Sequence, residues 1–214
     1  MPRGGPARAP TRPRTPTRPA PRLAPHAPRP TRLATRYPPP VLLRPATLHD
    51  LPALHAVERS ATEVYYDAGF APTHVCPRSD PELRQLLKYT TVLVACEDDH
   101  PVGYASYYAH GPFLHLEEVA VHRDHQRRGI GLALARQALA AAEADPQCSH
   151  LSLVAYRRAR WAIELYTRLG FRFLDPADAP PQAELLQEIV DIEAAAAQPG
   201  HGECRVAMLR PVER

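Results

Sequence analysis

The stretch from residue 122 to residue 133 constrains the fold most. It contains two glycines and lies between residues typical of a strand and residues that strongly favour a helix. Gly129 and Gly131 lack a Cβ atom, so the backbone can bend and present several N–H groups outward. Those groups lie at the positive end of the following helix, where an anion binds favourably. The stretch therefore predicts a cradle for phosphate or pyrophosphate, with Arg127 and Arg128 adding positive charge at its mouth.

Two common phosphate-binding motifs do not fit this spacing. A Walker loop needs Gly-Lys followed by Ser or Thr, and a dinucleotide-binding fold needs Gly-x-Gly-x-x-Gly after a strand. Neither pattern occurs at residues 122–133. An ordinary glycine-containing helix N-terminus remains the competing interpretation of these residues taken alone.

The remainder of the chain from Val41 onward alternates strand and helix patterns in the order β-α-β-β-β-α-β-α-β-α-β. This order predicts an α/β (α+β) fold, with a mixed and mostly antiparallel central sheet flanked by helices. Residues 67–82 are rich in proline and glycine, and they either shape a substrate pocket or simply connect elements. Strands are expected at residues 41–45, 91–96, 102–109, 113–121, 150–156, 171–174 and 203–209, and helices after Thr47, at 131–144, at 162–169 and from Pro181 to near Gly200.

The first forty residues differ sharply from the rest in composition. They contain nine Arg, thirteen Pro and no acidic residue, which predicts a disordered tail with polyproline character over 1–40. Since the whole chain carries +3, residues 41–214 carry about −6 and form the folded domain. The tail has no aromatic residue apart from Tyr37, which argues against base stacking and so against a nucleic acid partner.

Other partners and sites are limited by what the sequence lacks. It has no apolar run of 18 residues, so no membrane span is expected. Its four cysteines are widely scattered without metal-ligand spacing, which predicts reduced thiols in a cytoplasmic protein and no metal site. The sequence leaves the oligomeric state open, a dimer included.

The sequence Gln-Arg-Arg-Gly-Ile-Gly at 126–131, preceded by Val-Ala-Val at 119–121, resembles the coenzyme A-binding signature of the GNAT N-acetyltransferases. The resemblance extends over residues 41–210 and includes the segment Tyr-Thr-Arg-Leu-Gly-Phe at 166–171. It implies a splayed parallel strand pair at 150–156 and acetyl-CoA as cosubstrate. The implied activity is an acetyl-CoA-dependent N-acetyltransferase, which moves the acetyl group to a primary amine of a small molecule, peptide or protein by direct attack on the thioester.

The same resemblance assigns roles to individual residues. Backbone groups of 119–121 would pair with the pantetheine arm, and the N–H groups of 127–132 would hold the pyrophosphate. Tyr166 would protonate the departing thiolate, although its ring could equally serve as a core aromatic. The cofactor-binding residues expected in this way are Val119, Ala120, Val121, Gln126, Arg127, Arg128, Gly129, Ile130, Gly131 and Leu132.

The acceptor ammonium must lose a proton before it attacks, and His115, Glu117 and Glu118 are the candidate bases. Strand alternation places His115 and Glu117 on one face and Glu118 on the other, unless a β-bulge intervenes. Relatives often have such a bulge near here. We expect Glu117 to be the base with His115 assisting, and Glu118 is the alternative. The competing interpretation of each residue is a solvated or salt-bridged side chain.

One position departs from the family pattern. Many relatives have Asn where Ala159 or Ala162 stands, so Trp161 or the arginines of 157–160 would replace its contacts with the cofactor. The negative charge of the folded domain favours a cationic acceptor by long-range attraction. The alternative to an active enzyme is a non-catalytic acetyl-CoA-binding module.

Overall fold

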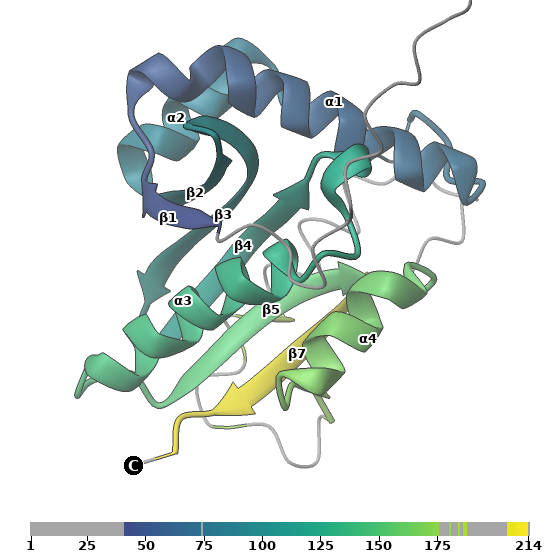
Figure 1. Ribbon diagram of the computed structural model, residues 1–214. Coiled ribbons are helices and arrows are strands. Elements are labelled where there is room, and N and C mark those ends of the chain that lie inside the picture. Colours follow the sequence, from purple (N-terminus) through teal and green to yellow (C-terminus); the bar gives the residue numbers. More distant parts are fainter. Residues whose placement is uncertain are drawn as a thin grey trace, which may run out of the picture. The chain divides into compact units, whose positions relative to one another are not determined.

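The computed structural model describes residues 41–73, 75–175, 180, 184, 186, 187 and 205–213. The tail of residues 1–40 and most of the helix expected after Pro181 lie outside these residues. Figure 1 shows the following helices and strands: β1 Leu42–Pro45, α1 Leu51–Asp67, α2 Asp80–Tyr89, β2 Thr91–Glu97, β3 His100–His110, β4 Phe113–Val121, α3 Ile130–Ala144, β5 His150–Tyr156, α4 Arg160–Arg168, β6 Arg172–Phe173 and β7 Arg205–Pro211, with 3-10 turns η1 Leu48–Asp50 and η2 Arg123–His125.

The strands form one sheet in the order β1-β2-β3-β4-β5-β7-β6. Every neighbouring pair is antiparallel except β4 and β5, which run parallel because α3 crosses between them. This arrangement confirms the predicted mixed, mostly antiparallel sheet with flanking helices.

The helices divide between the two faces of the sheet. Helices α1 and α2 pack against one apolar cluster, which includes Leu54, Leu83 and Tyr104. Helix α3 packs in a second cluster, where Ala135, Ala138 and Ala142 are buried and α4 contributes partly buried residues. In Figure 1, α3 and α4 lie on the near face of the sheet and α1 and α2 at its β1–β3 end. Small alanine side chains let α3 approach the strands closely, which positions its first turn beside β4.

Helix α2 is absent from the predicted order, which has only one helix before the second strand. Its N-terminus carries a capping box, in which Ser79 and Glu82 satisfy each other's free backbone donors, and a proline in the first turn. Leu83 and Leu86 then bury one face. The capping box and the proline were readable from the sequence, so this helix could have been predicted.

A β-bulge interrupts β4 at Glu117. Ser106 of β3 is opposite Glu118, whereas the next residue, Tyr107, is opposite Leu116, so Glu117 is the extra residue. The parallel pairing of β4 with β5 covers only residues 113–116 and 150–153, and the two strands separate beyond it. The bulge in β4 lies next to the point where β4 and β5 separate. Together they open the sheet between these two strands, where the splayed parallel pair was expected.

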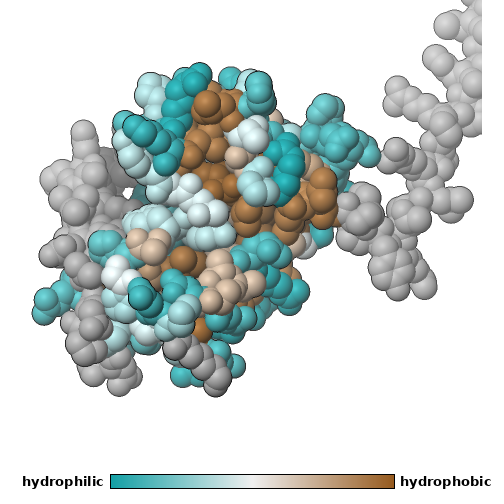
Figure 2. Space-filling model, turned by 90° about the vertical axis from the view of Figure 1, so that its left-hand side faces the viewer, coloured by the Kyte–Doolittle hydropathy of each residue, from teal (hydrophilic) through white to brown (hydrophobic). Residues whose placement is uncertain are grey.

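The β1 side of the domain carries an apolar surface. Strand β1 is an edge of the sheet, and Leu42 and Leu48 are 56% and 62% exposed. Figure 2 looks at the side with β1 and α2, where hydrophobic residues gather among hydrophilic ones. No helix in the described ranges is long and apolar enough to cross a membrane. Cys76, Cys96 and Cys148 form no disulfide bond with one another, and Cys204 lies outside the described residues.

Candidate active site

A cavity of about 940 Å³ lies where the sheet opens, bounded by α1, β4, the first turn of α3, β5 and α4. All but one of the residues expected to form the site line it, Arg128 being the exception. The expected residues that line the cavity are His115, Glu117, Glu118, Val119, Ala120, Val121, Gln126, Arg127, Gly129, Ile130, Gly131, Leu132 and Tyr166.

The turn before α3 has the backbone that the glycine pattern predicts. Gly129 caps α3 with φ 83°, and Arg127 also has a positive φ of 57°. Because the cap residue has no side chain, no side-chain cap satisfies the first-turn amides, which remain available to an anion. The stretch 127–132 is therefore suited to hold a pyrophosphate, as expected from the sequence.

Arg128 is engaged away from the cavity. Its guanidinium lies 2.7 Å from a carboxylate oxygen of Glu97, at the end of β2, and 3.2 Å from Nδ1 of His125. His125 Nδ1 lies 3.1 Å from the other carboxylate oxygen of Glu97. Of the two arginines expected at the mouth, Arg127 lines the cavity, while Arg128 ties the turn to the β2–β3 hairpin.

The stretch of β4 beyond the bulge presents one backbone edge to the cavity. Val119, Ala120 and Val121 pair with β3, but the register with β5 ends at Leu116. The side-chain amide of Gln126 donates a 3.0 Å hydrogen bond to the Val121 carbonyl, which fixes the turn against the strand. An extended, amide-containing ligand can pair along this edge as an added strand.

Three carboxylates converge on the guanidinium of Arg78. Its Nη1 lies 2.7 Å from Glu118 and 3.1 Å from Glu58, and its Nη2 lies 3.4 Å from Glu117. Both β4 glutamates therefore reach the same partner. The exception allowed for a β-bulge applies, because the bulge at Glu117 shifts the alternation by one residue and places Glu118 on the same face of the sheet as His115.

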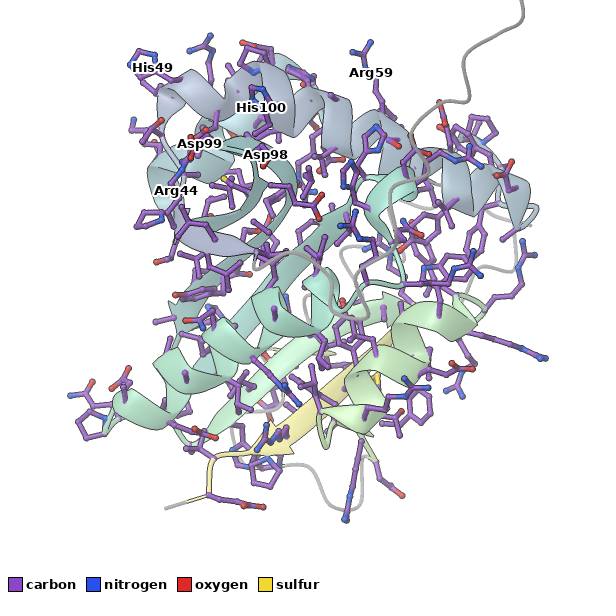
Figure 3. All side chains as sticks on the ribbon, in the orientation of Figure 1. Arg44, His49, Arg59, Asp98, Asp99 and His100 are labelled. Atoms are coloured by element: carbon purple, nitrogen blue, oxygen red, sulfur yellow. The ribbon has the colours of Figure 1, made fainter. Side chains whose placement is uncertain are left out.

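Glu58 forms the buried floor of this acid cluster, which we define as Glu58, Arg78, Glu117 and Glu118. Its carboxylate accepts a short hydrogen bond from the Tyr104 hydroxyl. Burial raises the pKa of Glu58, and the neighbouring charge of Glu118 raises it further, while Arg78 lowers it. The next residue, Arg59, projects from α1 away from the sheet in Figure 3. Among the acidic residues of α1, Glu58 alone is buried.

His115 is buried beside the cluster. It is 4% exposed, and its Nδ1 lies 2.9 Å from the hydroxyl of Ser152 on the parallel strand β5. Burial lowers its pKa to about 4, with a smaller contribution from His110. His115 is therefore a neutral imidazole at physiological pH, able to share hydrogen bonds in the cavity.

Tyr166 lies on α4, with its ring 5.9 Å from that of Phe171. Burial raises the pKa of its hydroxyl well above the usual range, and Tyr65 and Glu118 raise it further. The hydroxyl is consequently protonated at physiological pH, the state in which it can act as an acid.

Two of the three arginines expected as possible replacements for the missing Asn contact aromatic rings that do not line the cavity. Arg157 stacks on the ring of Phe173 and Arg158 on that of Phe70, at 4.8 and 4.4 Å from the ring centroids. Of the residues expected to replace the contacts of the missing Asn, only Trp161 lines the cavity.

Several cavity residues were not predicted. They are Glu58 and Tyr65 on α1, Arg78 on the following loop, Tyr156 on β5 and Arg205 on β7. A signal existed for the two α1 residues, because they continue the helical stripe of Leu51 and Leu54 at spacings of three and four. An acid inside such a stripe indicates a buried polar contact. Arg78 carries no comparable signal, because its partners come from other elements.

Comparison with known proteins places this geometry in a family. The structure superposes on the ribosomal-protein-S18-alanine N-acetyltransferase of Escherichia coli with a TM-score of 0.59 and 19% identity, over 81% of this chain and 95% of that one. It also superposes on the PaiA N-acetyltransferase of Thermoplasma acidophilum in complex with coenzyme A, with a TM-score of 0.60 and 14% identity over 80% and 99% of the two chains.

A third structure with the same fold is a phosphinothricin acetyltransferase from Sinorhizobium meliloti in complex with AcCoA. Its TM-score is 0.58 with 19% identity, over 80% of this chain and 88% of that chain. At such identities these likenesses concern the fold. Residues 55–171, more than half of the chain, match the sequence pattern of the Acetyltransferase (GNAT) family. Together with the fold, this match shows that the chain belongs to the GNAT acetyltransferases.

Proposed function

We propose that this protein transfers the acetyl group of acetyl-CoA directly to a primary amine of a small molecule, peptide or protein. The observation that carries the proposal is the meeting, in one cavity, of a side-chain-free helix N-terminus, an unpaired strand edge, a protonated phenol and two carboxylates. These are the groups that a coenzyme A thioester and an ammonium acceptor each require.

The cofactor would lie across the turn and the strand edge. The first-turn amides of α3 would hold the pyrophosphate, with Arg127 adding positive charge. The backbone of Val119 to Val121 would pair with the pantetheine amides. Coenzyme A structures of two proteins with the same fold support this choice of ligand. When bound, acetyl-CoA supplies an activated acetyl group as a thioester.

Two protein groups would then move the protons. Glu117 accepts the proton that the acceptor ammonium loses, and Tyr166 donates its proton to the thiolate sulfur as the C–S bond breaks. We assign the first role to Glu117 because its contact with Arg78 is longer, at 3.4 Å, than the 2.7 Å contact of Glu118. Glu118 would then mainly hold Arg78, and the neutral His115 would assist through hydrogen bonding.

A turnover assay tests the proposal. The full chain is incubated with acetyl-CoA and a panel of amines, free thiol is followed by absorbance, and acetylated products are identified by mass spectrometry. We expect amine-dependent thiol release and an N-acetylated product, with a strong loss in Tyr166→Phe. Turnover with no amine of the panel, despite measurable acetyl-CoA binding, would favour the alternative of a non-catalytic acetyl-CoA-binding module.

A further inference from the structure

Three aromatic rings, those of Tyr65, Tyr156 and Trp161, wall one part of the cavity, and the buried ring of Phe70 packs against them. The ring of Tyr65 lies edge to face with Trp161, Phe70 and Tyr156, at centroid distances of 5.1, 5.2 and 5.9 Å. These rings come from α1, the loop after it, β5 and α4, so they join segments from both ends of the sheet. Tyr65, Tyr156 and Trp161 line the cavity, and Trp161 is 40% exposed. The rings of Tyr65 and Trp161 offer a ligand an apolar surface, while the guanidinium of Arg205 lies over the ring of Tyr156, 4.3 Å from its centroid.

Tyr65 differs from its tyrosine neighbours in where its hydroxyl bonds. The Tyr66 hydroxyl donates to the Val75 carbonyl at 2.9 Å, and the Tyr156 hydroxyl accepts from Arg205 at 2.8 Å. Within the described ranges, the Tyr65 hydroxyl has no such partner, although this residue lines the cavity. A phenol that lines a cavity and bonds no other protein group can hydrogen-bond a ligand there.

The surroundings of that hydroxyl are acidic. Burial raises the pKa of Tyr65 far above its usual range, and the charge of Glu118 is the next largest cause. Tyr65 in turn raises the pKa of Tyr166, the acid of the proposed reaction. Tyr65 lines the same cavity as Glu117, Glu118 and Tyr166, which is where the proposed reaction brings the acceptor nitrogen.

We propose that Tyr65 determines acceptor specificity: its hydroxyl hydrogen-bonds the acceptor nitrogen opposite Glu117, and the aromatic wall packs against the carbon skeleton next to that nitrogen. This inference rests on the proposed N-acetyltransferase function. The acceptor class that follows is a primary amine on an apolar alkyl or aryl-alkyl group. A sugar-based or polycationic amine would place polar groups against the aromatic wall and leave them without partners.

The first test compares kinetics of the full-length protein and Tyr65→Phe, which keeps the ring and removes only the hydroxyl. With 2-phenylethylamine we expect KM for the amine to rise about tenfold, as for the loss of a hydrogen bond to a charged group, with KM for acetyl-CoA unchanged. Tyr89→Phe is the matched control, because Tyr89 is 68% exposed on α2. Wild-type protein should also prefer 2-phenylethylamine and hexylamine to spermidine and kanamycin.

The second test does not depend on turnover. Trp161 is the only tryptophan of the chain and lies against Tyr65, so its fluorescence reports ligand binding at the wall. Titration with 2-phenylethylamine in the presence of coenzyme A should give a Kd about tenfold higher for Tyr65→Phe than for wild type.

The outcomes separate the two proposals. Absence of turnover with every amine, with the fluorescence difference intact, contradicts the N-acetyltransferase function but supports the binding role of Tyr65. Turnover with equal amine KM and Kd for wild type and Tyr65→Phe overturns the role of Tyr65 and leaves the proposed function standing. A preference for spermidine or kanamycin overturns the acceptor class.

Discussion

Replacing Arg78 with glutamine should expose how the acid cluster is held together. The guanidinium contacts Glu58, Glu117 and Glu118, and the Glu58 side chain is only 7% exposed. Removing one partner of a buried ion pair costs about 3–5 kcal/mol, and the 24% exposure of Arg78 favours the lower end. At about 2–4 °C per kcal/mol, a loss of about 3 kcal/mol lowers Tm by about 6–12 °C at pH 8.

The loss should shrink as the pH falls. The folded-state pKa of Glu58 is raised, so this carboxyl favours folding at low pH, and its contribution disappears as the pH rises through that pKa. Arg78 lowers the same pKa, so its removal raises the pKa further and makes the decline with pH steeper. Once the pH has fallen through that raised pKa, Glu58 carries a proton, and only hydrogen bonds worth about 1 kcal/mol are lost.

Thermal unfolding at pH 5 and pH 8, followed by circular dichroism, measures both values. At pH 5 we expect a decrease of about 2–4 °C. Arg84→Gln is the control, because Arg84 forms an exposed i,i+4 ion pair with Asp80 on α2. A Tm decrease for Arg78→Gln that is equal at both pH values, or no larger than that of the control, would refute the account of the cluster given above.

Four further substitutions test the proposed roles of individual groups. Glu117→Gln should lower kcat by about 10²–10⁴-fold, because the carboxylate that takes the ammonium proton is lost, whereas Glu118→Gln should lower Tm more than kcat. Tyr166→Phe should lower kcat about 10²-fold with little change in either KM, since only the proton donor is removed. Glu97→Gln should raise KM for acetyl-CoA about three- to tenfold at unchanged kcat, because Arg128 loses the partner that fixes the turn before α3.

Each of these predictions has a clear contrary result. Larger kcat losses in Glu118→Gln than in Glu117→Gln would exchange the two assigned roles. An unchanged kcat in Tyr166→Phe would remove this residue from the chemistry. An unchanged KM for acetyl-CoA in Glu97→Gln, alongside unchanged values in the surface control Asp98→Asn at the neighbouring hairpin turn (Figure 3), would show that the turn keeps its shape without Glu97.

The fold and the glycine turn before α3 could be predicted because their signals are local. Strand alternation, the alanine-rich helix and the two glycines act over a few residues of backbone, whichever parts of the chain pack nearby. The capping box of α2 was a local signal too, and its omission from the expected order was an error of interpretation. The roles of the individual site residues stay predictions that the substitutions above test.

The acid cluster and its orientation were decided by the tertiary structure. Arg78 lies 20 residues from Glu58 and 40 from Glu118 along the chain, so no short pattern records their contact. The bulge at Glu117 depends on pairing with β3, and it lets both Glu117 and Glu118 reach Arg78. The sequence by itself thus determined the sheet, the turn before α3 and the candidate residues. Which charged side chains contact one another depended on packing between distant segments. The reason is that the interaction energy of two charges depends on their distance in space and not on their separation along the chain.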